Sequence, residues 1–310
     1  MRSFISILIL YFLLLFISSV GFSQPAPKTK VVITGVRFAY PLVEQWIHDY
    51  KSVNPSAEIV IDSRTNVDPA AYDLLIEAYE AESKPDRDYL YIARYAILPI
   101  ANSKSAFAKI YSEKGFNEAI IKQLFFKDEY DDNDSELAIK APYTLYTRVQ
   151  KAGAPTTFAS YFGFDQKGIS GKAISGGDEH LVKQVLRDTT GISYAPLGLA
   201  YDLTSRKPVD GISILPLDAN GNGRVSGDEK FYTTLETLIS RLEDEDQKPA
   251  QNIPVEYIHV SIKKDHANPA AEEFLTWVAQ HRNDALHDFG FLKLDKQHLE
   301  KRSEYLTSTK

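Results

Sequence analysis

The spacing of apolar and polar residues near the start of the chain predicts a strand, a helix and a second strand. Residues 31–33 are apolar and stand just before Gly35, as at the end of a strand that leads into a turn. Between residues 41 and 51 apolar side chains recur every three or four positions, and residues 58–62 are again mostly apolar. This order predicts two parallel strands joined by a crossover helix, and therefore an α/β domain. The apolar face of the helix consists of Leu42, Val43, Trp46, Ile47 and Tyr50.

Similar patterns predict the elements of the remaining chain. The run at 89–100 is rich in residues that favour strands, and it is long enough to pass from one domain to another. With 310 residues, of which 44% are apolar, the chain suits a globular protein of two domains. We expect further strands at 142–147, 212–215 and 255–263, a buried turn or strand at 191–194, and helices at 70–81, 105–126, 156–162, 179–187, 230–242 and 269–280.

The first 23 residues have the pattern of a secretory signal peptide. Arg2 precedes an apolar run of 17 residues at 4–20, and small residues follow at positions 21 and 23. We expect cleavage after Ser23 and a periplasmic or secreted protein. The alternative is a retained membrane anchor, for which this run is at the short limit of the length needed to cross a bilayer. No cysteine follows the apolar run, so the protein is not a lipoprotein.

Composition excludes several classes of function. The chain has no cysteine, which excludes disulfides and thiolate chemistry, and its net charge of −7 argues against general binding to nucleic acid or to anionic membranes. The seven histidines lack metal-ligand spacing, and no Gly-x-Ser-x-Gly motif or paired catalytic base indicates hydrolysis. We therefore predict a protein that is not an enzyme.

One segment of twelve residues, DANGNGRVSGDE at 218–229, matches the spacing of an EF-hand-like calcium loop. Gly223 occupies the sixth position, where the sharp turn requires glycine. Only one such loop exists, and it follows a predicted strand, so we expect a structural Ca²⁺ ion and not a switch. The alternative is a surface turn without metal. The predicted ligands are Asp218, Asn220, Asn222, the carbonyl of Arg224, Ser226 through water, and Glu229.

Five stretches, taken in order, carry a resemblance to a known family. They are VVITGVRFAYPLVEQWIHDYKSVNPSAEIVID, YIARYAILPIANSKS, LYTRVQKAGAPTTFASYFG, ISGGDEHLVKQVLRDTTGISYAPLGLAYD and FLTWVAQHRNDALHDFGFLKL. In this order and spacing the chain resembles the phosphate-binding proteins of ABC transporters, which are type II periplasmic binding proteins. The resemblance covers nearly the whole chain after the leader.

The resemblance implies a two-lobed α/β fold in which each lobe is a mixed sheet flanked by helices and two strands cross between the lobes. Lobe one would comprise residues 28–97 and 256–310, and lobe two residues 98–255 with the calcium loop. The ligand would be an inorganic oxyanion, phosphate first, held between the lobes. We expect a monomer with an ABC permease as its partner.

Three turns are candidates for contact with the anion. Free amides and the positive dipole end make helix N-termini suited to anions, and an arginine fork adds bidentate bonds. The first turn follows the strand at 31–33, the second follows Asp62 and opens a predicted helix, and the third follows the strand at 142–147. For Arg37 and Arg64 the alternative is an ordinary surface charge. The candidate residues are Arg37, Phe38, Ser63, Arg64, Arg148, Ala154, Thr156 and Thr157.

The third turn departs from the family's pattern. Where the family has a serine–glycine–threonine run, this chain has Ala-Gly-Ala-Pro-Thr-Thr, so hydroxyls remain only at positions 156 and 157. The aspartate that accepts a proton from hydrogen phosphate in the family has no clear counterpart, although Asp62, Asp86 and Asp88 are candidates. A site of donors alone should not reject sulfate. The alternative function is therefore a calcium-stabilised structural or adhesion protein that kept the fold and lost anion binding.

Overall fold

The computed structural model describes residues 30–64, 67–78, 85–126, 141–218, 220, 222, 224–244, 246, 253–265, 268–281 and 285–308. The predicted signal peptide at 1–23 and Gly223 of the predicted calcium loop lie outside these residues, so both interpretations stay predictions. Within the described part of the chain, no helix combines the length and the apolar character needed to cross a membrane.

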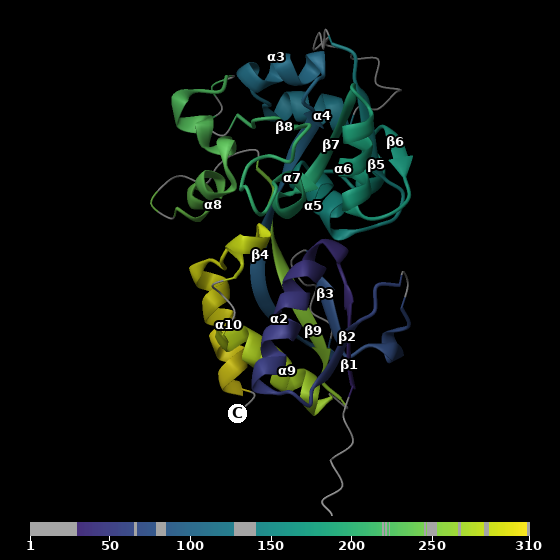
Figure 1. Cartoon of the computed structure of the whole chain (residues 1–310), viewed down its shortest axis with the longest axis vertical. Coiled ribbons are helices and arrows are strands. Elements are labelled where there is room, and N and C mark those ends of the chain that lie inside the picture. Colours follow the sequence, from purple (N-terminus) through teal and green to yellow (C-terminus); the bar gives the residue numbers. More distant parts are fainter. Residues whose placement is uncertain are drawn as a thin grey trace, which may run out of the picture.

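Two α/β halves lie end to end along the long axis of the molecule (Figure 1). We call the half that contains β1 lobe one, and its elements are β1 (Lys30–Gly35), η1 (Arg37–Ala39), α2 (Tyr40–Val53), β2 (Glu58–Ile61), η2 (Pro69–Ala71), β3 (Leu74–Glu77), β9 (Val255–Lys263), α9 (Pro269–His281), η5 (His287–Phe289), α10 (Lys296–Ser308) and the first part of β4 (Arg87–Asn102). β1 pairs in parallel with both β2 and β3, and β9 pairs antiparallel with β3 and β4. The predicted parallel pair with its crossover helix is therefore confirmed.

Lobe two is built on the second part of β4. Its elements are α3 (Ala106–Lys114), α4 (Glu118–Phe126), β5 (Thr144–Arg148), α5 (Gly153–Tyr161), η3 (Gln166–Gly168), β6 (Lys172–Ile174), α6 (Asp178–Arg187), β7 (Gly191–Pro196), α7 (Leu197–Ala200), β8 (Ile212–Ile214), η4 (Gly227–Thr233) and α8 (Leu235–Glu243). β4 pairs antiparallel with β7 and β8, and β5 lies parallel to β7 and β6. Both lobes therefore contain mixed sheets.

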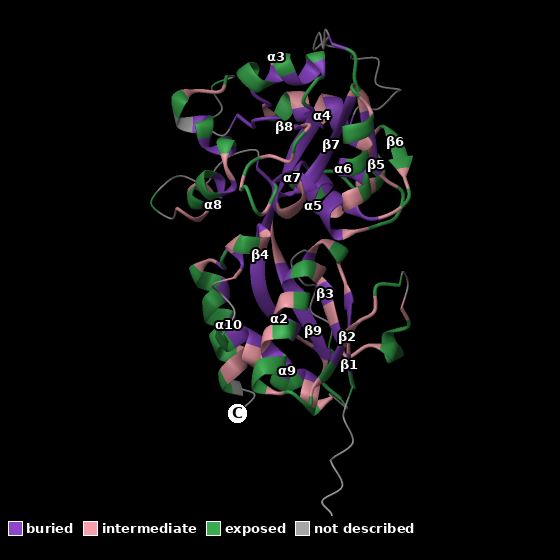
Figure 2. Cartoon of the chain, in the orientation of Figure 1, coloured by how far each residue is buried: buried purple, intermediate pink, exposed green. Residues whose placement is uncertain are grey.

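β4 is the strand that runs through both lobes. From Arg87 to Ala96 it pairs with β9, and from Ile97 onward it pairs with β7 and then β8. Figure 2 shows that β4 is buried along most of its length. The strand predicted at 89–100 is thus confirmed and extends further in both directions. The predicted lobe boundaries stay a prediction, although the change of pairing partner falls beside the boundary placed at 97/98.

α2 packs on the sheet through the face that the periodicity predicted. Its five predicted core residues are all buried. The ring of Tyr50 lies 5.2 Å from the rings of Phe274 and Trp277, both on α9. These edge contacts place α2 beside α9, and burial of such aromatic rings contributes strongly to a core.

The predicted helix at 70–81 is wrong in its described part. A single turn, η2, begins after Asp68, whose side chain accepts a hydrogen bond from the N–H of Ala70. The chain then extends into β3, where buried and partly buried residues alternate. Pairing with both β1 and β9 satisfies the backbone of β3, and this overrides the local helical pattern. Ser63, Arg64 and Val67 lie outside any helix, and residues 65 and 66, where the second predicted helix would open, lie outside the described residues.

A group of hydrogen bonds beside the crossing strands joins α8 to the segment that includes η5. Arg206 Nη2 donates to the carbonyl oxygen of His287 over 2.9 Å. Glu243 Oε1 lies 2.9 Å from His287 Nε2 and also accepts from the N–H of Lys293. The φ of Arg206 is 62°, a left-handed conformation that costs a residue with a side chain about 1–2 kcal/mol. The contacts of its guanidinium therefore hold a strained backbone in place.

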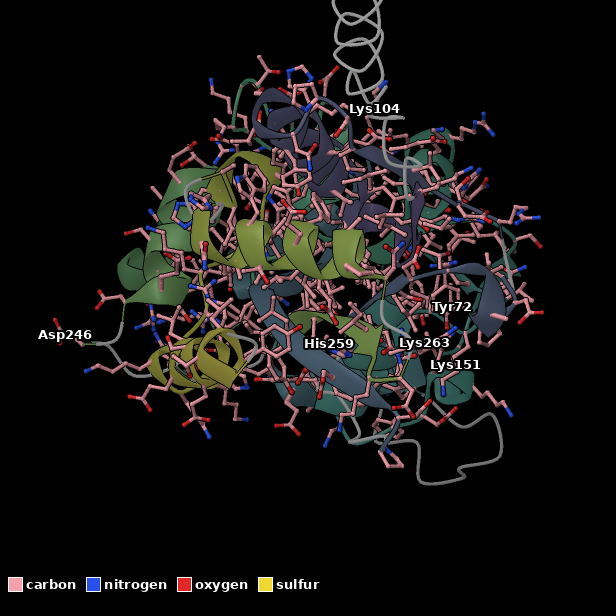
Figure 3. All side chains as sticks on the ribbon, turned by 90° about the horizontal axis from the view of Figure 1, so that it is seen from below. Tyr72, Lys104, Lys151, Asp246, His259 and Lys263 are labelled. Carbon is pink, nitrogen blue, oxygen red and sulfur yellow. The ribbon has the colours of Figure 1, made fainter. Side chains whose placement is uncertain are left out.

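We expect Glu243→Ala to lower the free energy of unfolding by about 1–3 kcal/mol, because the donors of His287 and Lys293 lose a charged acceptor. Denaturant unfolding of the parent and the variant measures this loss. Asp246→Ala is the matched control, since Asp246 is exposed just after α8 (Figure 3). Equal stability of the two variants would show that these bonds do not contribute.

Candidate functional site

A cleft of about 570 Å³ is lined by both lobes. Lobe one contributes the turn after β1 and the outward side of β3, and lobe two contributes the residues after β5 and those at the start of α6. The fold thus brings together segments that lie more than a hundred residues apart in the sequence. Of the predicted anion-binding residues, Arg37, Phe38, Arg64, Arg148 and Thr156 line the cleft.

Arg148 ends β5, and its guanidinium is largely buried in the wall of the cleft. The side chain is 11% exposed, and Nη1 donates to Asp178 Oδ1 over 3.1 Å. The Nε–H is buried and has no hydrogen-bond partner among the described residues. A buried charged donor without a partner costs free energy, which an anion in the cleft would recover. Arg148 therefore lines the cleft, and its contact with an anion stays a prediction.

Asp178 is a cleft residue that the sequence reasoning missed. It is the first residue of α6, its side chain is 5% exposed, and it follows Gly176, whose φ of 117° favours glycine. Burial raises the pKa of Asp178, and the nearby Arg148 guanidinium opposes that rise. The Gly-Gly-Asp sequence at the start of a predicted helix was the signal that could have located this carboxylate.

A second carboxylate, Glu77, lines the cleft from the end of β3. Its Oε2 lies 3.2 Å from Nε2 of the buried His259 on β9. Arg37 reaches the cleft from η1, and its Nη2 donates to the carbonyl oxygen of Ser63 over 2.9 Å. Lobe one therefore supplies a cation and a carboxylate, as lobe two does with Arg148 and Asp178.

The three aspartates that the sequence suggested lie elsewhere. Asp62 accepts hydrogen bonds from Arg64, which lower the pKa of Asp62 to about 2. Asp86 is exposed, and Asp88 Oδ1 lies 3.5 Å from Nζ of Lys264. None of the three lines the cleft. Among the described residues, the carboxylates that line the cleft are Glu77 and Asp178.

The start of α5 differs in detail from the prediction. Ala154 is buried, and the hydroxyl of Thr157 donates to the carbonyl oxygen of Ala78 over 3.2 Å and lies 2.6 Å from the hydroxyl of Tyr95. Because α5 begins at Gly153, Thr157 stands a full turn inside the helix and faces the core. Neither Ala154 nor Thr157 lines the cleft, and their contact with an anion stays a prediction.

Two other predicted residues have partners at the cleft edge. Thr156 lines the cleft, and its hydroxyl donates to Gln166 Oε1, which also accepts from the N–H of Ala152. Ser63 does not line the cleft, and its described role is to accept the bond from Arg37. Ser63 itself lies outside any helix, and its contact with an anion stays a prediction.

The two lobes touch at Gly153. A Cβ built on this glycine would stand 2.5 Å from the Cβ of Ala78, closer than real side chains come, and 3.2 Å from Cγ1 of Val36, which is a tight contact. Only glycine lets α5 approach lobe one at this point. The contact fixes one border of the cleft next to the crossing strands.

In the predicted calcium loop, backbone N–H groups donate to side-chain oxygens of the same loop. The N–H of Asn222 donates to Asp218 Oδ1 and Asn220 Oδ1, both over 3.0 Å. Glu229 accepts from the N–H of Asn220 and, over 2.9 Å, from the N–H of Ser226. The N–H of Arg224 donates to Asn222 Oδ1 over 3.0 Å. This bond does not use the carbonyl oxygen of Arg224, which is the predicted ligand atom. Asp218 and Glu229 are 1% and 2% exposed.

The loop is attached to the junction between α3 and α4. The N–H of Asp218 donates to the carbonyl of Phe116 over 2.8 Å, and the N–H of Val225 donates to the carbonyl of Glu113 over 3.4 Å. Within the described residues, no group of three or more His, Cys, Asp or Glu side chains could hold a metal ion. The predicted calcium site uses two described carboxylates, and asparagine, serine and backbone oxygens would complete it. Calcium binding stays a prediction.

Solved structures resemble this one along most of its length. No protein-family model matches the sequence, and no curated protein matches it with significance. A substrate-binding protein assigned to a phosphate ABC transporter, with bound phosphate, from Clostridium perfringens superposes with a TM-score of 0.62 at 14% identity, over 86% of this chain and 100% of that chain. An ABC-type phosphate transport receptor from Vibrio cholerae gives 0.56 at 9% identity, over 85% and 100%.

The chain has the two-lobed fold of periplasmic binding proteins. The predicted fold class is therefore confirmed. The regulatory domain of CcmR from Synechocystis PCC6803, in complex with 2-PG, also superposes, with a TM-score of 0.51 at 13% identity over 82% of this chain and 98% of that domain. At these identities the likeness shows the fold alone, because the same fold serves both transport receptors and regulatory domains.

Proposed function

We propose that the chain is a solute-binding protein that captures an inorganic oxyanion, phosphate first, between its two lobes. The observation that carries this proposal is the buried Arg148 guanidinium, whose Nε–H lacks a partner among the described residues. The bound phosphate of the Clostridium perfringens neighbour supports it. After cleavage of the predicted signal peptide, the monomer would act in the periplasm or outside the cell and deliver the anion to an ABC permease.

The charge of the cleft supports an anionic ligand. Among the described residues that line the cleft, basic side chains from both lobes outnumber the carboxylates, although Arg64 is paired with Asp62 and the net charge of the chain is −7. Such local concentration of one sign attracts an ion of the opposite sign. The basic residues are Arg37, Arg64, Arg148 and Lys151, and the carboxylates are Glu77 and Asp178.

We expect Arg148→Ala to weaken phosphate binding by about tenfold to a hundredfold, since a charge-assisted hydrogen bond contributes about 1.5–3 kcal/mol. Arg148→Lys should also weaken binding, because lysine lacks the planar fork. Isothermal titration calorimetry with phosphate measures both effects, and thermal unfolding confirms that each variant is folded. Arg187→Ala, at the exposed end of α6, is the control. Unchanged affinity in Arg148→Ala would sink the assignment of the cleft.

The two cleft carboxylates change the expected selectivity. A carboxylate accepts a proton from hydrogen phosphate and repels sulfate, which has no proton to donate. Asp178, placed against Arg148, is the better positioned of the two for an ion held by that guanidinium. The sequence-based expectation of indifference to sulfate rested on donors alone, and the described cleft contains more than donors.

The parent should therefore bind phosphate more tightly than sulfate at neutral pH. Asp178→Asn should reduce the ratio of phosphate affinity to sulfate affinity by about tenfold. The variant removes one repulsive contact between a carboxylate and sulfate, and such a contact is about as strong as a hydrogen bond to a charged group. Titration of both anions into the parent, Asp178→Asn and Glu77→Gln measures the ratio and shows which carboxylate sets it. Equal affinities for phosphate and sulfate in the parent would contradict this selectivity. Binding of neither anion would favour the alternative, a calcium-stabilised structural or adhesion protein.

We also propose that residues 218–229 bind one structural Ca²⁺ ion. What supports this is the convergence of the oxygens of Asp218, Asn220, Asn222 and Glu229, two of them from buried carboxylates. Calcium prefers such oxygen ligands and would neutralise the two negative charges. The ion would hold η4 and α8 against the junction of α3 and α4.

Calcium should raise the stability of the folded protein by about 2.7 kcal/mol at a hundredfold excess over its Kd, because it binds only the folded state. A chelator should reverse the gain, and Glu229→Ala should abolish it. Thermal unfolding with and without calcium measures both. Asp210→Ala, an exposed aspartate outside the loop, should respond to calcium as the parent does. A melting temperature indifferent to both calcium and chelator would show that the segment is only a turn.

A further inference from the structure

The cleft is larger than an inorganic phosphate ion needs. Its volume is about 570 Å³. If each phosphate oxygen occupies about the 30 Å³ of a water molecule, the ion fills roughly 120 Å³. Volumes of about 300–1,000 Å³ are typical of sites for organic ligands. Most of the cleft would remain unfilled around an inorganic ion.

The lobes already touch at the border of the cleft next to β4. Gly153 is already too close to Ala78 for a side chain to fit between them, and the hydroxyl of Thr157 donates to the Ala78 carbonyl across the same junction. The cleft therefore keeps its volume while the lobes are in contact.

The wall on lobe one has the chemistry of a site for a carbon skeleton with hydroxyl groups. Leu75 and Glu77 point to the same side of β3, because alternate residues of a strand share a face, and both line the cleft. Val67 and Tyr72 add apolar surface beside them, and all four side chains are partly buried. The Arg87 guanidinium lies 5.6 Å from the centre of the Tyr72 ring, which fixes that ring in position.

This wall lines the same cleft as the basic residues Arg148 and Lys151 of lobe two. Tyr72 of lobe one and Lys151 of lobe two both line the cleft and lie on the same side of the molecule, away from Asp246 (Figure 3). A ligand whose phosphate contacts Arg148 can therefore extend past Lys151 toward Tyr72. Glu77 would accept hydrogen bonds from its hydroxyls, and Leu75 and Tyr72 would cover its carbons.

We propose that the cleft binds small phosphate monoesters of polyols more tightly than inorganic phosphate. The phosphate group occupies the place at Arg148, and the polyol lies against Tyr72, Val67 and Leu75. This inference rests on the proposed function, because it uses the same anion contact. It extends that function from an ion to an organic phosphate.

Calorimetric titration of the full chain with inorganic phosphate, glycerol 3-phosphate and glucose 6-phosphate, under one set of conditions, tests the proposal. At least one ester should bind about tenfold or more tightly than phosphate. Tyr72→Ala should weaken ester binding by about tenfold and leave phosphate binding within about twofold, because only the ester reaches the ring. Val149→Ala is the matched control, since Val149 follows Arg148, is 57% exposed and does not line the cleft.

Two results would overturn the inference and leave the proposed function intact. One is phosphate binding as tight as that of every ester. The other is an equal loss of phosphate and ester affinity in Tyr72→Ala. Val67→Ala, a smaller truncation outside any helix or strand, repeats the test if Tyr72→Ala is unstable, and it should show the same selective loss. Binding of neither phosphate nor esters by the parent would overturn both proposals together.

Discussion

The antiparallel pairing of β4 with β9 is the interaction on which the remaining structure depends. Its register runs from Arg87 opposite Lys263 to Ala96 opposite Val255, with one irregularity after Tyr91. Because β4 continues into the sheet of lobe two, this pair of strands connects the two lobes. The cleft lies between the lobes, and Tyr95 of β4 binds the carbonyl of Ala78 where they touch. Loss of the hydrogen bonds between β4 and β9 would remove the structural support of the cleft.

The cleft combines strong opposing charges with incomplete pairing. A buried guanidinium without a partner is costly, and a buried ion pair recovers that cost only when its other donors and acceptors are satisfied. Asp178 satisfies one side of Arg148, and the Nε–H is left without a partner among the described residues. An anion beside this donor would relieve the residual cost. On the facing lobe, Glu77 Oε2 lies 3.2 Å from Nε2 of His259.

Much of the fold could be predicted because its elements have clear periodicity. The helices α2 and α9 and the strands β4 and β9 were predicted within a few residues, since each has a regular apolar pattern. The failure at 70–81 has a specific cause: Leu74, Leu75 and Ile76 form a short apolar run that suits either a helix or a strand. Pairing with β1 and β9 decides for the strand. That decision is non-local, and it also brings Glu77 to the cleft.

The sequence by itself determined the local features: the α/β order, the twelve-residue loop from Asp218 to Glu229, and Arg148 at the end of a strand. These depend on residues near one another in the chain, so spacing and propensity suffice. Only the tertiary structure decided that Asp178 and Glu77 line the cleft while Asp62, Ala154 and Thr157 do not. The physical reason is that the direction of a side chain depends on where its helix or strand begins and on what packs against it. The first residue of an element and its packing partners are set only when the lobes fold together.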